Sequence, residues 1–158
     1  MLNQFSIILP CYNEKDNLNL LIDLIEDNLK ALKVEYEIII VDDSSIDGTK
    51  ELINTKYKNN SRVRIINRIK DRSLGKSVGD GLISSNFENI IVMDADFNHN
   101  PEYLKDIIKL QKNNNFDMIC CSRFTNNSKK ESSFRFNASK YYNFILKPFL
   151  SSNISDQL

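Results

Sequence analysis

The sequence predicts one α/β domain whose single, mostly parallel sheet is doubly wound, with helices on both faces. Apolar runs that do not alternate with polar residues recur along the chain, and such runs are typical of strands buried on both faces. Segments with the three-and-four spacing of an amphipathic helix separate these runs. The length of 158 residues also matches a single domain, since domains average about 150 residues.

The apolar runs place the expected strands in chain order. They cover residues 5–9, 36–41, 63–67, 90–93 and 117–122. Pro10 is expected to end the first strand, because proline cannot donate a hydrogen bond to a sheet. The alternation of strand and helix predicts parallel neighbours joined by right-handed crossovers.

Helical periodicity fills the intervals between these strands. Asn13 is expected to cap the first helix. The apolar face of that helix is formed by Leu18, Leu21, Ile22, Ile25, Leu29 and Leu32. Later helices are expected to open near residues 47–49, to run from about 74 to 85, and to begin at Pro101. An apolar stripe over 141–149 predicts a last helix.

Composition limits the classes of function. The 21 basic and 21 acidic residues cancel, so no general field attracts nucleic acid or an anionic membrane, although local patches remain open. The cysteines Cys11, Cys120 and Cys121 lack a metal-binding spacing, and their odd number favours a reducing compartment. No basic signal region or membrane-spanning run is present. We therefore expect a cytoplasmic protein, with peripheral contact at the cytoplasmic membrane face left open.

The strand expected at 90–93 leads directly into two acidic residues, Asp94 and Asp96. Ligands of parallel sheets bind outside the carboxyl ends of the strands, so a functional site is expected here. Residues two apart on an extended chain point the same way, so both carboxylates could face one cation. With the Asn98 oxygen they would suit Mg²⁺ or Mn²⁺. The alternative is that all three only end the strand and cap the helix after Pro101.

Polar residues follow four of the five expected strands, which weakens the alternative of unrelated caps. They are Tyr12, Asn13 and Glu14 after the first, Asp42 and Asp43 after the second, Asp94 and Asp96 after the fourth, and Arg123 after the fifth. Familiar phosphate motifs do not fit. Lys70 stands where a P-loop ending in Gly75 to Ser77 needs glycine, and the first turn lacks the glycines of a dinucleotide-binding fold.

Four segments together resemble family 2 glycosyltransferases of the GT-A fold, namely residues 5–14, 41–49, 94–96 and 121–124. Residues 94–101 are similar to the Asp-Ala-Asp-x-Gln-His-x-Pro stretch of dolichol- and polyprenol-phosphate mannosyltransferases. Asn98 stands where that subgroup usually has glutamine. The likeness covers nearly the whole chain and implies one catalytic, donor-binding domain over residues 1–158.

The resemblance implies a role for each matching residue. The nucleotide sugar would be bound by Pro10, Tyr12, Glu14, Val41, Asp43, Asp94 and Ala95. Asp96 and Asn98 would hold the divalent ion, Mg²⁺ or Mn²⁺, which stabilises charge on the leaving diphosphate. Arg123 and Arg135 would hold the acceptor phosphate, since a guanidinium fork matches phosphate geometry. These two arginines and Asp96 form the expected catalytic set, with a solvated helix position as the alternative for Arg135.

The implied reaction is inverting transfer of a hexose from GDP-mannose or a UDP-hexose to a polyprenyl (dolichyl) phosphate. Such a phosphate is already an anion, so no general base is required. Two alternatives stay open: polysaccharide or glycolipid synthesis on a glycan acceptor, and a non-catalytic nucleotide-sugar-binding module. Residues 154–158 look like the opening of the family's Ser-Asp-x-x-Ser-Gly stretch. We therefore expect a C-terminally truncated domain, with a membrane-anchored partner chain as a source of the missing acceptor half.

Overall fold

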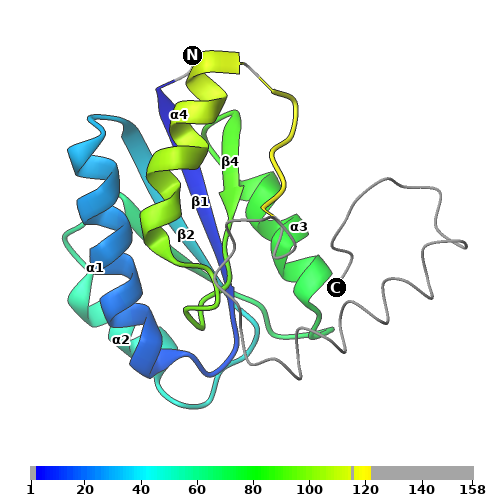
Figure 1. Ribbon diagram of the computed structural model, residues 1–158. Coiled ribbons are helices and arrows are strands. Elements are labelled where there is room, and N and C mark those ends of the chain that lie inside the picture. Colours follow the sequence, from blue (N-terminus) through cyan, green and yellow to red (C-terminus); the bar gives the residue numbers. More distant parts are fainter. Residues whose placement is uncertain (1–2, 115, 122–158) are drawn as a thin grey trace, which may run out of the picture. The chain divides into compact units, whose positions relative to one another are not determined.

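The computed structural model describes residues 3–114 and 116–121. Its described strands form one parallel sheet in the order β3-β2-β1-β4 (Figure 1). They are β1 (Gln4–Cys11), β2 (Glu35–Asp42), β3 (Val63–Asn67) and β4 (Asn89–Val92). The chain divides into two compact units, Met1–Phe116 and Asp117–Leu158, and the sheet belongs to the first. The strand order reverses at β1, which has β2 on one side and β4 on the other.

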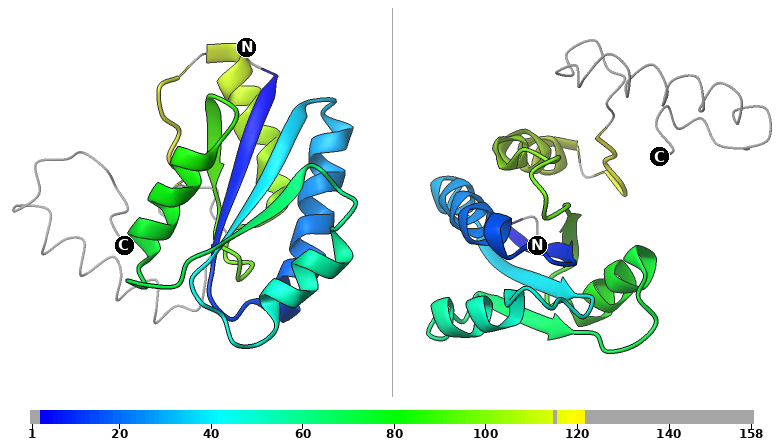
Figure 2. Two further views of the ribbon diagram at one scale, coloured as in Figure 1. Left: turned by 180° about the vertical axis from the view of Figure 1, so that it is seen from behind. Right: turned by 90° about the horizontal axis from the view of Figure 1, so that it is seen from below.

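Helices cover both faces of the sheet, as the sequence predicted. They are α1 (Lys15–Ala31), α2 (Thr49–Lys56), α3 (Leu74–Ser84), the short 3-10 helix η1 (Pro101–Tyr103) and α4 (Leu104–Asn114). The helices α1, α2 and α4 lie on one face, and α3 lies on the other (Figure 2). This arrangement confirms the doubly wound α/β fold.

Two apolar layers hold the sheet between its helices. The larger layer joins the sheet to α1, and the predicted apolar face of that helix is fully buried at Leu18, Leu21, Ile22, Ile25 and Leu29. The smaller layer, on the α3 face, is made by Ile8, Ile39 and Val41. Each such side chain contributes about 1.5–3 kcal/mol when it leaves water. The α1 layer therefore supplies most of the apolar stabilisation.

A glycine allows α3 to approach β1 closely. Gly81 is buried in α3, and a Cβ atom at this position would lie 2.5 Å from Cγ2 of Ile8. That separation is well inside normal carbon contact distances, so a larger residue would push the helix from the sheet. At Gly79, in the same helix, nothing lies within 4 Å of the equivalent Cβ position. The missing side chain of Gly81 thus sets how α3 seats on the sheet.

Strand β1 extends beyond Pro10, where the sequence predicted its end. Pro10 still pairs with Val41 of β2. On the other side, the β1–β4 ladder ends with the bond from the Met93 N–H to the Ile8 carbonyl at 3.0 Å. Alternate residues of a strand face the same neighbour, so the nitrogen of Pro10 faces β4 and has no hydrogen to donate. Pro10 therefore ends the ladder to β4 rather than the strand itself.

The fifth strand predicted over 117–122 is wrong for the part that the structure describes. Residues 117–121 are not in a strand, because an apolar run becomes a strand only where a neighbour satisfies its hydrogen bonds. The helix predicted over 141–149 lies outside the described residues. Within the described ranges, no helix is both long and apolar enough to cross a membrane.

Candidate functional site

Four loops follow the carboxyl ends of the strands, at the lower end of the sheet in Figure 1. Each loop holds one residue other than glycine with a positive φ. These are Asn13 (58°), Ser44 (64°), Asp71 (55°) and Phe97 (64°). Such backbone angles cost of order 1–3 kcal/mol and gather at functional sites. The strained loops therefore mark the edge where ligands of parallel sheets bind, beside the β1–β4 reversal of strand order.

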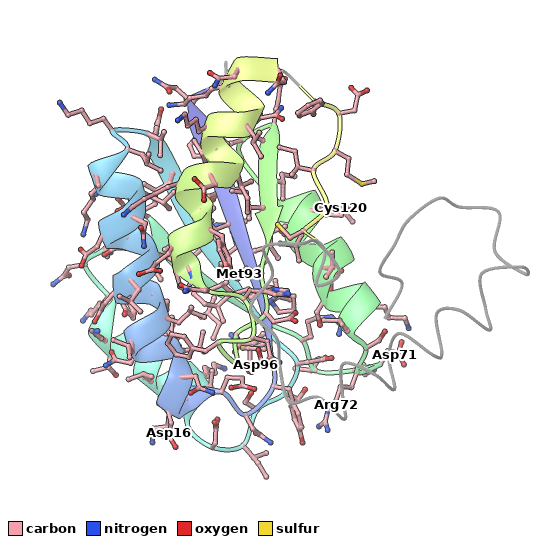
Figure 3. All side chains as sticks on the ribbon, in the orientation of Figure 1. Asp16, Asp71, Arg72, Met93, Asp96 and Cys120 are labelled. Carbon is pink, nitrogen blue, oxygen red and sulfur yellow. The ribbon has the colours of Figure 1, made fainter. Side chains whose placement is uncertain are left out.

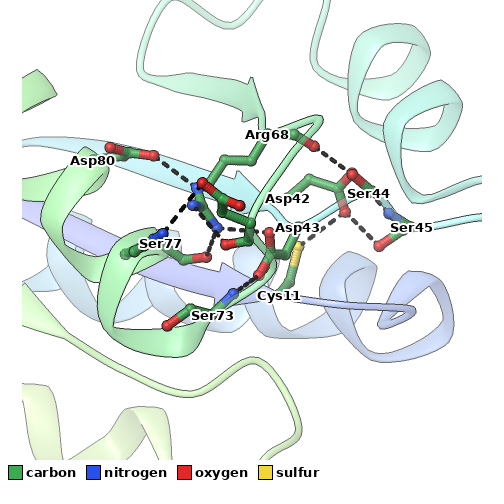
Figure 4. A network of polar contacts seen from close by, with 11 residues as sticks. Cys11, Asp42, Asp43, Ser44, Ser45, Arg68, Ser73, Ser77 and Asp80 are labelled. Carbon is green, nitrogen blue, oxygen red and sulfur yellow. Dashed lines mark hydrogen bonds and ion pairs between the residues drawn. The ribbon is translucent and has the colours of Figure 1, made fainter.

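The guanidinium of Arg68 is buried at this edge (Figure 4). Its Nη1 donates to Asp43 Oδ1 at 2.6 Å and to Ser77 Oγ at 3.2 Å. Its Nε donates to Asp80 Oδ2 at 2.7 Å, and its Nη2 donates to the Asp71 carbonyl at 3.2 Å. Carboxylates neutralise the cation and its hydrogen bonds are made, which is what a buried charge requires. Arg68 thus fixes the loop after β2, the loop after β3 and helix α3 to one another.

Asp43, which was expected to contact the nucleotide, lies under this guanidinium. Its second oxygen, Oδ2, accepts the Ser73 N–H at 2.7 Å. Both oxygens therefore have a protein partner, but a carboxylate oxygen offers more than one acceptor site. A ligand at Asp43 would meet a carboxylate whose orientation is already fixed.

The neighbouring acid, Asp42, has different partners. Ser45 donates to it through its hydroxyl and, at 3.2 Å, through its backbone N–H. The Cys11 thiol lies 3.6 Å from Asp42 Oδ1. Burial and the negative charge of Asp42 raise the pKa of the Cys11 thiol. Cys11 is therefore a neutral interior group and not a nucleophile.

Asn13 joins the first loop to the second. Its Oδ1 accepts the Ile46 N–H at 3.0 Å, and its own N–H donates to the Ser45 hydroxyl at 2.7 Å. The N-cap position of α1 is occupied by Glu14. The predicted capping of α1 by Asn13 is therefore wrong, because its side chain bonds to the neighbouring loop.

Asp47 stabilises the first turns of two helices at once. Its Oδ2 accepts the Lys15 N–H of α1 at 2.9 Å. Its Oδ1 accepts the N–H and the hydroxyl of Thr49, in α2, at 3.0 and 2.7 Å. Partial burial raises the pKa of Asp47, but the bonds from Thr49 and Lys15 outweigh it, so that the pKa lies below its ordinary value. A carboxylate is favourable at helix N-termini, and ionised Asp47 therefore links α1 to α2.

Two residues expected at the nucleotide, Tyr12 and Glu14, follow β1. The Tyr12 ring is 40% exposed, and the guanidinium carbon of Arg72 lies 3.8 Å from the ring centroid. This is a cation–π contact. Glu14 accepts the Asn17 side-chain N–H at 2.7 Å. The loops after β1 and β3 thus present an aromatic face and a cation together.

The acidic loop after β4 is not extended. Strand β4 ends at Val92, and Asp96 lies in a turn. The predicted extended backbone, from which a shared direction of the Asp94 and Asp96 side chains was argued, is therefore wrong. The Asp94 N–H donates to His99 Nδ1 at 3.0 Å, and His99 Nε2 lies 3.7 Å from Asp94 Oδ2. The other ring nitrogen, Nε2, is thus the one that faces the carboxylate.

Asp96 is paired with Asn98. Its Oδ1 accepts the Asn98 N–H at 3.0 Å, and its Oδ2 accepts the side-chain amide at 2.6 Å. Neither caps the following helix, since Asn100 does so by accepting the Glu102 N–H at 3.0 Å. The helix-cap part of the alternative is therefore wrong, while its other part, that these residues only form the turn after the strand, stays open.

The oxygen donors of Asp96 and Asn98 fit a hard divalent ion. Both side chains are exposed and adjacent, and carboxylate and amide oxygens are the ligands of Mg²⁺ and Mn²⁺. The amide of Asn98 now presents its nitrogen to Asp96, so its oxygen would have to turn. Within residues 3–114 and 116–121, no three or more His, Cys, Asp or Glu side chains form a group able to hold a metal. An ion here would share its coordination with a ligand such as a diphosphate.

Three further expected site residues, Pro10, Val41 and Ala95, have buried side chains. Val41 packs with Ile8 and Ile39, and Ala95 belongs to the larger apolar layer. Arg123 and Arg135 lie outside the described residues.

Arg68, Asp47 and His99 were not among the site residues predicted from the sequence. Arg68 directly follows strand β3, as Asp43 directly follows β2, and this position was the available signal. His99 lies within the acidic segment that was already singled out. The double role of Asp47 had no sequence signal, because it depends on how two loops meet.

Solved structures share this fold. The crystal structure of S. aureus TarS, residues 1–349, matches with a TM-score of 0.62 and 25% identity, over 82% of this chain and 38% of that one. Glucosyl-3-phosphoglycerate synthase from Mycobacterium tuberculosis, in complex with uridine-diphosphate, matches with a TM-score of 0.50 and 20% identity, over 65% of this chain and 37% of that one. The fold is therefore that of the GT-A glycosyltransferases, as predicted.

Sequence comparison gives the family. Residues 6–157 match the glycosyl transferase family 2 model, and the chain belongs to this family. Dolichol-phosphate mannosyltransferase of Pyrococcus furiosus is 36% identical over 129 residues, 80% of this chain and 35% of that protein. The putative glycosyltransferase CsbB of Bacillus subtilis is 34% identical over 148 residues, 90% of this chain and 42% of that protein. The chain thus spans less than half the length of these relatives.

Proposed function

We propose that this chain is the donor-binding domain of an inverting, metal-dependent transferase that moves a hexose from a nucleotide-diphosphate sugar to a polyprenyl phosphate. Family 2 membership supplies the reaction class. The observation that carries the proposal is the adjacency of two loops at the reversal of strand order. One loop presents the exposed ring of Tyr12, and the other presents Asp94 and Asp96.

In this proposal the nucleotide lies over the ends of β1 and β2. Tyr12 offers an aromatic face for the base. Asp43 accepts an N–H of the base edge, and its orientation is held by Arg68 and by the Ser73 N–H. Glu14 and Asp94 contact the ribose side, and the floor is made by Pro10, Val41 and Ala95.

Asp96 and Asn98 hold Mg²⁺ or Mn²⁺, which when bound stabilises negative charge on the leaving diphosphate. Arg123 and Arg135 bind the acceptor phosphate through paired N–H donors. Because a phosphate monoester is already an anion at neutral pH, this chain needs to position the acceptor and not to deprotonate it.

The acceptor is proposed from the relative in Pyrococcus furiosus, whose name records dolichol phosphate. A lipid-linked acceptor places the reaction at the cytoplasmic face of a membrane. A membrane-anchored chain is the protein partner proposed for the acceptor side.

Calorimetry and thermal denaturation of the 158-residue chain with UDP, GDP and ADP, each with and without Mn²⁺, test donor binding. A nucleotide at ~100 times its dissociation constant should add about 2.7 kcal/mol of stability. Radiolabelled GDP-mannose and UDP-glucose, offered with a polyprenyl phosphate or an oligosaccharide, then test transfer. If only the oligosaccharide accepts sugar, a glycan replaces polyprenyl phosphate as the proposed acceptor. Nucleotide binding without any transfer would indicate a binding module. Absence of nucleotide binding would refute the proposal.

A further inference from the structure

Exposed apolar and basic residues adjoin each other in the loop after β3 and the first turn of α3. Ile69 is 83% exposed and Leu74 is 64% exposed. Lys70, Arg72 and Lys76 are exposed between and beside them. We call these five residues the 69–76 patch. It lies within one compact unit and next to the candidate site.

The combination of apolar tips and cations distinguishes the 69–76 patch from other exposed apolar residues. Ile46 is 88% exposed but lies between acidic residues, and Ile83 is 86% exposed in a stretch, 77–104, without lysine or arginine. Over 69–76, three cations face one acid, Asp71, which gives a local charge of +2 in a chain whose net charge is +0. The patch therefore has a local field that the whole chain lacks.

The charges of this patch are open to a ligand. Lys76 Nζ lies 3.3 Å from Asp71 Oδ2, with 58% and 75% of the side chains exposed, and such exposed pairs are weak. The guanidinium of Arg72 stacks on Tyr12. This contact uses the flat face of the guanidinium and leaves the N–H groups, which lie in its plane, able to donate. Beneath the loop, Arg68 donates to the Asp71 carbonyl at 3.2 Å. The exposed side chains of the patch thus project from a loop whose backbone is held in place by Arg68.

We propose that the 69–76 patch docks on an anionic membrane surface. Ile69 and Leu74 enter the interface, because aliphatic side chains gain by leaving water. The three cations meet lipid phosphates, and each contributes about fivefold in affinity. This deepens the proposed function, on which it rests in one respect: a lipid-linked acceptor presents its phosphate at such a surface. Figure 3 shows Asp71 and Arg72 toward the same end of the sheet as Asp96.

Vesicle co-sedimentation of the whole 158-residue chain tests this docking. The probes are vesicles of phosphatidylcholine alone and of equal parts phosphatidylcholine and phosphatidylglycerol. They contain neither nucleotide nor polyprenyl phosphate, so the measurement does not depend on transfer. We expect binding to the anionic vesicles that weakens as salt is added, and much weaker binding to the neutral ones.

Paired variants identify the surface. Ile69→Ser with Leu74→Ser should lower the partition coefficient at least about tenfold. Lys70→Gln with Lys76→Gln should lower it about twenty-five-fold on anionic vesicles and little on neutral ones. Ile46→Ser with Ile83→Ser, and Lys105→Gln with Lys109→Gln on α4, are matched exposed controls that should bind like the unchanged chain. The thermal midpoints of all four should stay near that of the unchanged chain, since every substituted side chain is exposed.

Absence of binding to anionic vesicles, or equal losses in the controls, would overturn the proposal. Retained vesicle binding, with loss of self-association in Ile69→Ser with Leu74→Ser, would instead make the patch a protein interface. Calorimetry with UDP and GDP on the same proteins separates the two proposals. Vesicle binding without nucleotide binding refutes only the proposed function, and nucleotide binding without vesicle binding refutes only the docking surface.

Discussion

Arg68 Nη1 and Asp43 Oδ1 meet at 2.6 Å, and 7% of each side chain is exposed. This ion pair joins the loop after β2 to the start of the β3–α3 connection, at the polar edge of the sheet. The same contact therefore supports the fold and orients the Asp43 carboxylate.

Removal of Arg68 should destabilise the fold strongly. In Arg68→Met, the buried carboxylate of Asp43 loses its partner, and breaking such a pair costs about 3–5 kcal/mol of the free energy of unfolding. Urea denaturation measures the loss. Arg62→Met is the control, because the Arg62 guanidinium is exposed above the Tyr36 ring and should change stability far less. Similar losses in both variants would contradict the role given to Arg68.

Two glycines of one helix should respond in opposite ways to alanine. Gly81→Ala places a methyl group against Ile8 and should cost about 1–3 kcal/mol through overpacking. Gly79→Ala meets nothing within 4 Å and should stabilise α3 by roughly 0.5–1 kcal/mol, because alanine is the better helix former. Thermal denaturation measures the change in stability of each variant. Equal changes would show that close packing of α3 on the sheet does not depend on Gly81.

Asp43→Asn should weaken UDP or GDP binding more than Asp42→Asn does. Asparagine keeps the size of the side chain, but a hydrogen bond to a charged group is worth about 1.5–3 kcal/mol, or at least tenfold in affinity. Asp42 is occupied by Ser45 and lies beside Cys11, away from the Arg68 contact. Calorimetry at a temperature where both variants remain folded compares them, and a larger loss in Asp42→Asn would reverse the assignment.

Asp96→Asn should remove the Mn²⁺-dependent part of nucleotide affinity and leave the fold intact. The side chain is exposed, and its described protein bonds are local ones to Asn98. Asp16→Asn, an exposed acid in the first turn of α1, is the matched control. Nucleotide titrations with and without Mn²⁺ measure the difference. An unchanged Mn²⁺ dependence would take Asp96 away from the ion.

Asp47→Ala should lower the free energy of unfolding by about 1 kcal/mol at neutral pH, since one carboxylate bonds to the starts of two helices. The folded pKa of Asp47 lies below its ordinary value, so the ionised form is the stabilising one. Its pH-dependent contribution is present above about pH 4 and is lost as the pH falls through the folded pKa. In urea denaturation, the difference in free energy of unfolding between the variant and the unchanged chain should therefore be smaller at acidic pH than at neutral pH. A constant difference would mean that the charge of Asp47 plays no part.

The strands and helices that the sequence predicted are those whose evidence is local. Non-alternating apolar runs marked β1 to β4, and three-and-four spacing marked the buried face of α1. The failures depend on partners distant in sequence. Residues 117–121 resemble a strand but pair with none among the described residues, and Asn13 bonds to the loop after β2 instead of to its own helix.

The candidate site divides in the same way. Its position at the carboxyl ends of strands was predictable from where Asp43 and Asp94 fall in the sequence. The contacts of Arg68 were not, since its partners come from β2–α2, from its own loop and from α3. The turn at Asp96 also escaped prediction, because an extended continuation of the strand was assumed and the local bonds between Asp96 and Asn98 were not foreseen.

The hydrogen that Pro10 lacks has a further consequence for the acidic loop. Pro10 has no N–H in any conformation, so a β4 strand continued past Met93 would leave one of its carbonyls without a donor from β1. Further pairing is thereby disfavoured, and Asp94 and Asp96 lie outside the ladder. A residue with an N–H at position 10 would supply the absent donor and so favour a longer β1–β4 ladder at the expense of the acidic loop.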